Sequence, residues 1–512
     1  MSKIFVFAIG GTGSRVVKSL IFLLASGVKI NADKVIPIFI DPDKSNGDLN
    51  RTLRLLQTYQ QIRNSLKKEP NLVDPTKNRF FSTEVINWNQ LSQKSDDNEI
   101  KTQGFKWEML NSDASTFGDF IDFVSLSDED KLFVRGFFSD SNLNLNLEVG
   151  FKGNPHIGSV VLNQFVQDEE NFNKFANNFN AGDRIFIIGS IFGGTGAAGL
   201  PLLVKNLRAM EDGNNAGAIR TARIGTLLAM PYYGVNSQSQ SEINSSQFIA
   251  KTKAALHYYD RTLKDQVDAM FYIGDDQKKS NNYEYAVGQK EQTNHANFIE
   301  VASALAIIDF MEMEEFSSGT SVGQRIQTYY KEFAVDHITS NPISFINLSD
   351  ATKKKIAKPM TAFHLAIFYI NNYLDKAIKK ERPPWVGDGA TKIETTFLSS
   401  SFFQKLSSFV HDYNSYMEEL SSNVARAFRP FKLSIPPNQI NHIVTDVEPE
   451  KKKLFGGKDM DSEYLTHLMN SVNSKGTSQN SLSPEQKVMY YLNEAMSNGV
   501  KEKYSHSLED AV

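Results

Sequence analysis

A glycine-rich segment, residues 190–199, constrains the fold more than any other part of this sequence. It reads Ser-Ile-Phe-Gly-Gly-Thr-Gly-Ala-Ala-Gly and lies between an apolar run at 184–189, which predicts a buried strand, and a predicted helix from Leu200. Glycine lets a backbone turn sharply and approach a ligand closely, because it has no Cβ. The free N–H groups at the start of a helix attract anions. The segment therefore predicts a phosphate-binding turn between a strand and a helix.

A second glycine-rich segment follows the first predicted strand, residues 4–9, and reads Gly10-Gly11-Thr12-Gly13-Ser14. The pattern after it predicts a helix at 14–25 and a strand at 35–40. A strand, a helix and a strand in this order indicate a right-handed parallel unit, whose ligands bind beyond the carboxyl ends of the strands. Asp41 and Asp43 lie at such an end. Two glycine turns of this kind suggest one nucleotide bound from two sides.

Strands alternate with helices over the first 300 residues, which predicts an α/β fold with a mostly parallel, Rossmann-like sheet covered by helices on both faces. We expect one nucleotide-binding domain at 1–310, with residues 45–148 as a large inserted surface subdomain. The apolar spacing at 297–313 predicts an uninterrupted central helix. Helical patterns dominate the last third, so we expect a mainly helical C-terminal domain at 360–512.

Composition excludes several classes of function. The chain has no cysteine, so disulfides, thiolate metal sites and cysteine nucleophiles are excluded. Its formal net charge of −4 argues against a dominant nucleic-acid-binding surface. The longest apolar stretch, residues 19–28, is too short to span a bilayer, and residues 1–3 lead directly into a strand without a signal peptide. We therefore expect a cytoplasmic protein without a transmembrane segment.

Other glycine-rich motifs fit the sequence less well. A P-loop ends in Gly-Lys followed by Ser or Thr, but Gly457-Lys458 is followed by Asp459. The dinucleotide fingerprint G-x-G-x-x-G matches residues 194–199, but it usually lies at the first strand–helix turn of a domain rather than in the middle of a chain. An NAD(P)-binding enzyme is therefore an alternative, although the sequence contains no identifiable acid or base for hydride transfer.

The order of the motifs resembles the tubulin/FtsZ superfamily. In that family the first strand ends in a glycine-rich phosphate loop, which 10–14 resembles, and the second ends in an acidic loop, which 41–43 resembles. The γ-phosphate loop carries Asn-Pro followed by Gly, as does Asn154-Pro155-His156-Ile157-Gly158. The signature G-G-T-G-[ST]-G is similar to Gly193-Gly194-Thr195-Gly196-Ala197-Ala198-Gly199, although Ala197 replaces Ser or Thr and the last glycine comes one position later. The first loop looks most like that of divergent prokaryotic tubulin-like proteins.

Later segments continue the resemblance. The ribose-side loop resembles 230–232, and the start of the central helix, which contacts the base in the family, corresponds to Asn297 and Phe298. Residues 345–350, within an activating-loop segment at 311–359, resemble the motif N-x-D-x-x-D. The family spacing places acids at 349 and 352, where this chain has serine and threonine.

The resemblance implies a GTP/GDP-binding protein with Mg²⁺ at Asp41 and Asp43, which assembles head to tail into cytoskeletal filaments. Asn347 and Asp350 of the next subunit would complete the GTPase site, and the missing acids favour slow hydrolysis. The implied nucleotide-binding residues are Gly10, Gly11, Thr12, Gly13, Ser14, Asp41, Asp43, Asn154, Gly193, Gly194, Thr195, Gly196, Ala197, Asn297 and Phe298.

Structural alternatives remain for several of these residues. Asp41 and Asp43 are also typical of turns and helix caps, and Asn154-Pro155 is typical of a plain turn. Asn297 could be an exposed helix residue, Phe298 a core residue, and Ser349-Asp350 the start of a helix. A second functional hypothesis is a nucleotide-sensing scaffold that does not hydrolyse GTP. In it, the insertion and the C-terminal region would bind protein partners.

Overall fold

The computed structural model describes most of the chain. The residues outside the description are 1, 44, 75, 92–104, 108–113, 165–168, 212, 236–244, 276–281, 284–293, 315–326, 335–341, 451–462, 473–481, 505–506 and 509–512.

A seven-stranded sheet, with every pair of neighbouring strands parallel, forms the centre of the molecule. Its spatial order is β3-β2-β1-β4-β5-β7-β9. The strands are β1 (Lys3–Ile9), β2 (Lys34–Ile40), β3 (Glu84–Val85), β4 (Arg184–Ser190), β5 (Arg223–Ala229), β7 (Ala269–Gly274) and β9 (Tyr329–Ala334). All seven residues of β1 are buried, as expected for a central parallel strand covered on both faces. The expected α/β fold is confirmed.

The strand order reverses direction at β1. This strand pairs with β2 on one side, where Ile9 lies opposite Ile40, and with β4 on the other, where Ala8 lies opposite Ile188. The connections that follow β1 and β4 therefore leave the sheet on opposite sides of one crevice. Ligands of open parallel sheets bind in such a crevice, beyond the carboxyl ends of the strands.

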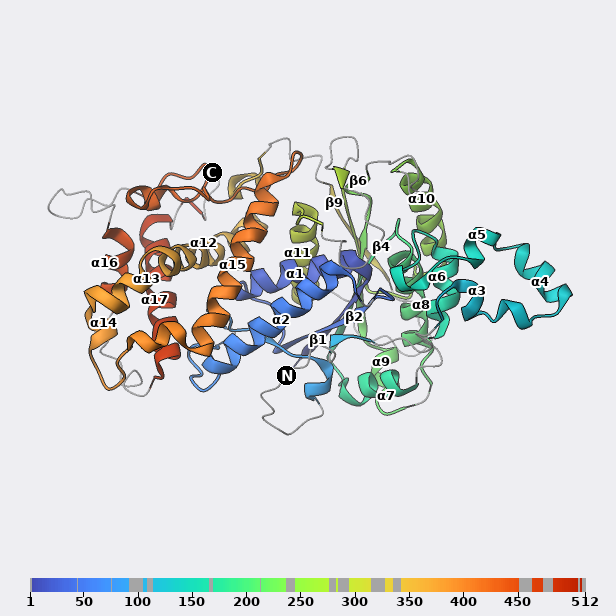
Figure 1. The fold of residues 1–512 in the computed structure, drawn as a ribbon, viewed down its shortest axis with the longest axis horizontal. Coiled ribbons are helices and arrows are strands. Elements are labelled where there is room, and N and C mark those ends of the chain that lie inside the picture. The colour runs from blue at the N-terminus through green and yellow to red at the C-terminus, as the bar shows by residue number, and fades with distance from the viewer. Residues whose placement is uncertain are drawn as a thin grey trace.

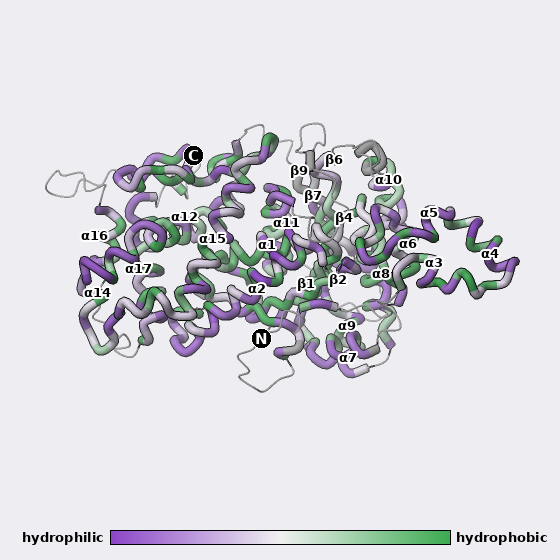
Figure 2. The backbone as a smooth tube through the Cα atoms, in the orientation of Figure 1, coloured by the Kyte–Doolittle hydropathy of each residue, from purple (hydrophilic) through white to green (hydrophobic). Residues whose placement is uncertain are grey.

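Helices cover both faces of the sheet (Figure 1). Alternate β1 residues, Ile4 and Phe5 among them, belong to two separate hydrophobic cores. One face carries α1 (Gly10–Ala25), α2 (Gly47–Leu66) and α11 (Phe298–Glu312). The other carries α6 (Pro155–Leu162), α7 (Glu169–Asn178), α8 (Thr195–Ala209), α9 (Ala216–Arg220) and α10 (Ser245–Thr262). In Figure 2 the hydrophobic colour gathers around β1, β2 and α1, inside these helical layers.

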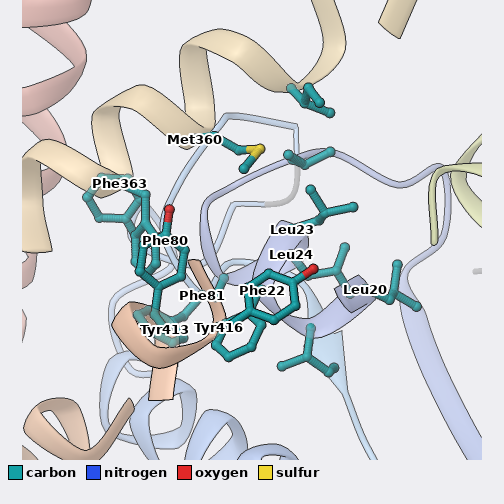
Figure 3. Close-up of a cluster of buried hydrophobic side chains, with 14 of the residues drawn as sticks. Leu20, Phe22, Leu23, Leu24, Phe80, Phe81, Met360, Phe363, Tyr413 and Tyr416 are labelled. Atoms are coloured by element: carbon teal, nitrogen blue, oxygen red, sulfur yellow. The ribbon is translucent and has the colours of Figure 1, made fainter. Parts of the chain in front are cut away.

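The last third of the chain is mainly helical, as expected, and packs on the α1–α2 face. Its helices are α12 (Asp350–Asn372), α13 (Leu374–Lys376), α14 (Pro384–Gly387), α15 (Ser401–Ser422), α16 (Tyr464–Ser471) and α17 (Pro484–Tyr504). The ring of Phe22 in α1 stacks on Tyr416 in α15, with 4.5 Å between centroids (Figure 3). The helical region and the sheet region thus share one hydrophobic core. Within the described residues, no helix combines the length and hydrophobicity needed to cross a membrane.

Residues 45–148 contribute to the sheet region in two ways. Helix α2 packs between α1 and α15, and β3 extends the sheet beside β2. Later residues form the small helices α3 (Phe117–Phe120), α4 (Asp128–Arg135) and α5 (Asp140–Leu143), which project from the molecule at the right of Figure 1. A separate two-stranded sheet joins β6 (Gly234–Val235) to β8 (Asn282–Tyr283).

Candidate nucleotide-binding site

The two glycine turns predicted from the sequence lie against each other. Helix α1 begins directly after β1, at Gly10, whose φ of 69° suits glycine. A Cβ added at Gly10 would lie 3.5 Å from the Cβ of Thr195, and 3.9 Å from the backbone nitrogen of Gly196, in the first turn of α8. The starts of α1 and α8 therefore meet at the crevice where the strand order reverses.

The predicted Asn-Pro loop joins the same place. A Cβ added at Gly194 would lie 2.8 Å from the Cβ of Phe151, 3.2 Å from the nitrogen of Gly153 and 3.3 Å from that of Asn154. The side chain of Asn154 donates hydrogen bonds to the carbonyl oxygens of Phe151, at 3.1 Å, and Lys152, at 3.3 Å. Asn154 thus stabilises its own loop, and it begins α6 beside the second glycine turn.

Two of the glycines allow the helices to approach the strands before them. A Cβ at Gly13 would lie 2.6 Å from the carbonyl carbon of Ala8, and one at Gly196 would lie 2.6 Å from the nitrogen of Ser190. Both distances are shorter than any tolerable contact, so a side chain would push α1 or α8 away from the sheet. These glycines set the positions of the two helix starts.

The three helices that begin at this crevice share two features, which α16 (Tyr464–Ser471) also has. The N-termini of α1, α6 and α8 have no capping side-chain hydrogen bond and no acidic residue in the first turn. In contrast, α2, α11, α12 and α15 each have a side-chain cap. The first N–H groups of a helix have no partner within it and carry the positive end of its dipole. Three uncapped starts in one place provide a concentration of N–H donors suited to phosphates.

Asp41 and Asp43 follow β2 at the same edge of the sheet. Oδ1 of Asp41 accepts a hydrogen bond from the Asp43 nitrogen at 3.1 Å, whereas its buried Oδ2 has no hydrogen-bond partner among the described residues. Burial raises the pKa of Asp41 to about 7, and the nearby carboxylate of Asp43 adds to this shift. Oδ1 of Asp43 instead accepts bonds from the nitrogen of Ser45, at 3.1 Å, and its hydroxyl, at 3.0 Å.

The donor set at this edge fits Mg²⁺, which is a hard cation that usually binds one or two carboxylates together with phosphates. Oδ2 of Asp41 is a buried carboxylate oxygen available for such a ligand bond. Asp43 has the contacts of the turn residue that the sequence also allowed. In the described part of the chain, no three acidic or histidine residues are grouped into a metal site of their own.

A buried ionic cluster lies behind the first glycine turn. Nε of Arg15 donates to Glu300 at 2.6 Å, Nη1 to Asp48 at 2.9 Å, and Nη2 to the hydroxyls of Tyr232 at 2.8 Å and Thr12 at 3.3 Å. The cluster joins the starts of α1, α2 and α11. The cluster was not predicted from the sequence, although a single arginine on a nearly all-apolar helix indicates buried acidic partners.

The structure places Asn297 and Phe298 at the start of α11 and inside the protein. Oδ1 of Asn297 accepts a hydrogen bond from the Ile299 nitrogen at 2.9 Å and so caps the helix. Phe298 is 1% exposed and packs against Phe428, with 5.2 Å between ring centroids. For Phe298 these contacts are those of the core alternative. The base-contacting role of both residues stays a prediction.

Asn347 and Asp350 lie at the start of α12, close to α11. Oδ1 of Asn347 accepts a hydrogen bond from the Ser344 nitrogen at 2.7 Å, and Asn347 lines a cavity with Phe298 at the start of α11. Asp350 lies in the first turn of α12, where its side chain is 57% exposed and 3.4 Å from Nζ of Lys353.

The catalytic roles of Asn347 and Asp350 stay a prediction. Helix α11 runs away from the glycine turns and ends near the start of β4, where Nη1 of Arg184 donates to the Phe310 carbonyl oxygen. Lys355, five residues after Asp350 in α12, forms an ion pair with Glu312 at this far end of α11. Glu312 and Glu314 lie at the far end of α11.

Similarity to known proteins was found in solved structures only, at low sequence identity. No protein-family model matches the chain, and no curated protein matches it in sequence. Among solved structures, CetZ from Methanosaeta thermophila strain DSM 6194 matches at 12% identity over 63% of this chain and 57% of that chain, with a TM-score of 0.28. CetZ2 from Haloferax volcanii, in a GTPγS-bound protofilament, matches at 12% identity over 62% of this chain and 61% of that chain, with a TM-score of 0.26.

This chain spans about three fifths of the length of the two structures that it matches. Both are tubulin/FtsZ-like proteins, the superfamily that the sequence motifs resemble. The superposition is partial, so the strands and loops of this chain, rather than the match, carry the functional argument.

Proposed function

We propose that this chain is a divergent tubulin/FtsZ-like protein that binds a guanine nucleotide at the crevice between β1 and β4. The convergence of three uncapped helix starts, those of α1, α6 and α8, carries this proposal. Their N–H groups would neutralise the phosphates, which a P-loop protein does partly with lysine. The absence of acidic residues from all three first turns supports the same ligand, because a carboxylate there would repel phosphate.

Mg²⁺ would bind Oδ2 of Asp41 and the phosphates in this arrangement. The cation would neutralise charge on the phosphates and orient them. Of the two acidic residues after β2, Asp41 fits this role better, because the described contacts of Asp43 hold the turn at Ser45.

We further propose that the protein assembles head to tail, so that the carboxyl edge of one subunit faces the far end of α11 in the next. In this arrangement Glu312 or Glu314 would approach the phosphates of the neighbouring subunit. Glu314 is the better candidate to orient the attacking water, since Glu312 forms an ion pair with Lys355.

A second candidate function is a nucleotide-dependent scaffold that does not hydrolyse GTP. It is favoured by Ser349 and Thr352, which stand where the family spacing places acids, and by the ion pair of Asp350 with Lys353. In this case GTP would hold the protein in an assembling or partner-binding state without turnover.

Identifying the nucleotide that copurifies with the protein tests the proposal. The native protein would be desalted and denatured, and the released small molecules identified by mass spectrometry. GTP or GDP near one per chain is the expected result, and retained GTP alone supports the scaffold. NAD(P), or refusal of every added guanine nucleotide, would refute guanine-nucleotide binding. Light scattering and negative-stain microscopy with and without GTP then test assembly. A polymer that forms only with nucleotide is the expected result, and its absence would refute head-to-tail assembly.

A further inference from the structure

We propose that the chain binds a compact, multiply charged phosphate anion at a second site, in a basic hollow between the sheet region and the helical region. The hollow has a volume of about 340 Å³ and lies between the loop at 76–79, Lys29 in the segment after α1, and helices α12 and α17. Its cationic residues are Lys29, Lys77, Arg79, Lys358 and Lys501.

The charge of this hollow is unbalanced. Five cationic side chains line it, but Glu494 is the only acidic residue among its described lining. Arg79 forms an ion pair with Glu494, and Lys77 pairs with Asp74 at 3.3 Å. Lys29 and Lys501 are exposed, and neither has an ion pair within the described part of the chain. Because the whole chain carries a formal net charge of −4, this positive charge is a local feature.

The walls also supply neutral hydrogen-bond donors. Ser497, with a hydroxyl, and Asn78 and Asn498, with side-chain amides, line the same hollow, whereas the hydroxyl of Thr76 donates to Asp74 at 2.6 Å. Hydroxyls, amides and ammonium groups together suit the several oxygens of a phosphate group. The volume is that of a small-ligand pocket, which is typically about 300–1,000 Å³, so the hollow favours a compact anion over a long acidic polypeptide.

Two contacts hold the walls of the hollow in place. The backbone of the 76–79 loop packs on Gly27, where an added Cβ would lie 2.9 Å from the carbonyl carbon of Asn78. The nitrogen of Phe80 donates to Oδ1 of Asn493 in α17 at 2.9 Å. These contacts preorganise the cationic groups before any ligand arrives, which lowers the entropic cost of binding.

This site is separate from the glycine turns. Helix α1, with 16 residues, begins at the first glycine turn and ends next to the hollow. At about 1.5 Å per residue the two sites lie about 24 Å apart. The proposal therefore does not depend on which nucleotide binds at the crevice.

Charge reversal at the two unpaired lysines tests this site. The probe is inorganic triphosphate, titrated by calorimetry into the full chain and into the double variant Lys29→Glu/Lys501→Glu. The matched control is Lys354→Glu/Lys392→Glu, which changes the net charge equally at exposed positions outside the hollow. Triphosphate that binds at the glycine turns would add the same binding signal in the wild type, the hollow variant and the control.

We expect the hollow variant to lose one triphosphate site per chain, or to bind it at least about tenfold more weakly, while the control matches the wild type. Triphosphate should also protect Lys29 and Lys501, but not Lys354, from acetylation by a reagent, as read by mass spectrometry. Equal stoichiometry and affinity in the variant and the control would overturn the proposal, and so would unchanged acetylation.

The source of the phosphate is distinguished in a second arm. The proteins would be mixed with phosphatidylcholine vesicles that contain a phosphatidylinositol phosphate. If the wild type and the control float with these vesicles and the hollow variant does not, the site binds a lipid headgroup. Triphosphate binding without flotation would assign it to a free phosphate. If the hollow variant instead changes self-association and leaves triphosphate binding intact, the site is a protein contact and the proposal is wrong.

Discussion

Gly194 has no room for a side chain, because its Cα packs directly against the loop that contains Asn154. An added Cβ would lie 2.8 Å from the Cβ of Phe151 and 3.2 Å from the nitrogen of Gly153. Gly194→Val should therefore separate the second glycine turn from that loop and weaken guanine-nucleotide binding by about 100-fold or more, since a displacement of about 1 Å can cost that much. Fluorescent-nucleotide titration measures this effect.

Gly217→Val is the matched control for this prediction. Gly217 lies in α9, and an added Cβ there would meet no atom within 4 Å. The control should bind nucleotide with wild-type affinity and lose only a little stability. Wild-type affinity in Gly194→Val would show that the nucleotide does not bind at this crevice.

The burial of Asp41 predicts how the free energy of unfolding changes with pH. The pKa of Asp41 is about 7 in the folded protein, well above its ordinary value near 4. The folded state thus holds the Asp41 proton more tightly than the unfolded state does. The protonated carboxyl therefore stabilises the fold below about pH 4, and this contribution is lost as the pH rises to about 7. The loss in the free energy of unfolding is at most about 4 kcal/mol for the nucleotide-free protein.

Thermal unfolding at a series of pH values tests Asp41. The variant Asp41→Asn should remove this dependence and also the stabilisation by Mg²⁺ with nucleotide at pH 8. Asp43→Asn is the control, since the described bonds of Asp43 stabilise a turn at Ser45, and it should keep both effects. If the nucleotide-free profile of Asp41→Asn matches that of the wild type, the carboxyl titrates normally and the assignment of Mg²⁺ loses its support.

At the scale of elements, the Arg15 cluster joins three helices that the sequence places far apart. The Arg15 side chain is 3% exposed, and it contacts Asp48 of α2 and Glu300 of α11 at 2.9 and 2.6 Å. Arg15→Met would leave two buried carboxylates without their cation. We expect the free energy of unfolding to fall by about 3–5 kcal/mol, measured by urea denaturation.

Lys18→Met is the control for the cluster, one turn further along α1. Nζ of Lys18 lies 3.3 Å from Glu419, and these two side chains are 13% and 17% exposed. Lys18→Met should lower the free energy of unfolding clearly less than Arg15→Met does. Water can still reach Glu419 in this variant, and Arg51 also contacts Glu419. Equal losses in the two variants would show that the cluster is no more important than a half-buried ion pair.

The elements differ in how far the sequence could predict them. Strands β1, β4 and β5 and helices α1 and α11 are apolar over most of their length, so their patterns predict buried elements between glycine turns. Strand β9, Tyr-Tyr-Lys-Glu-Phe-Ala, is polar because it pairs with only one described strand, β7, and its pattern gave no signal. Helix α2 carries its buried residues on one stripe of a polar sequence, so it was assigned to a surface insertion.

The site was also only partly predictable from the sequence. The glycine turns were predicted because local sequence determines a strand–turn–helix unit. The segment at 345–350 was matched by its letters alone, and its role stays a prediction. Arg15 was missed because its partners, Asp48 and Glu300, lie 33 and 285 residues away in the sequence.

At the scale of the whole molecule, the parallel sheet gives the subunit two chemically different ends. The carboxyl edge carries the three uncapped helix starts, and the opposite edge carries the end of α11 with Glu312 and Glu314. Different surfaces on opposite ends of one subunit allow a heterologous contact, which produces open filaments when its rotation does not close. Only a group at the far end can reach the nucleotide of the next subunit in such a filament.

This polarity predicts which acidic residue affects turnover. Glu314→Gln should slow assembly-dependent GTP hydrolysis by about 100-fold, as expected for the loss of a general base or a water-orienting carboxylate, and should leave nucleotide affinity unchanged. Asp350→Asn is the comparison variant, because its carboxylate pairs with Lys353 in its own helix, and its rate should equal that of the wild type. Phosphate release at matched polymer mass is the measurement. A slow Asp350→Asn beside a fast Glu314→Gln would instead assign the water-orienting role to Asp350, as the resemblance implies. A wild type that polymerises without releasing phosphate would identify the non-hydrolysing scaffold, since the far end of α11 would then supply contact without catalysis.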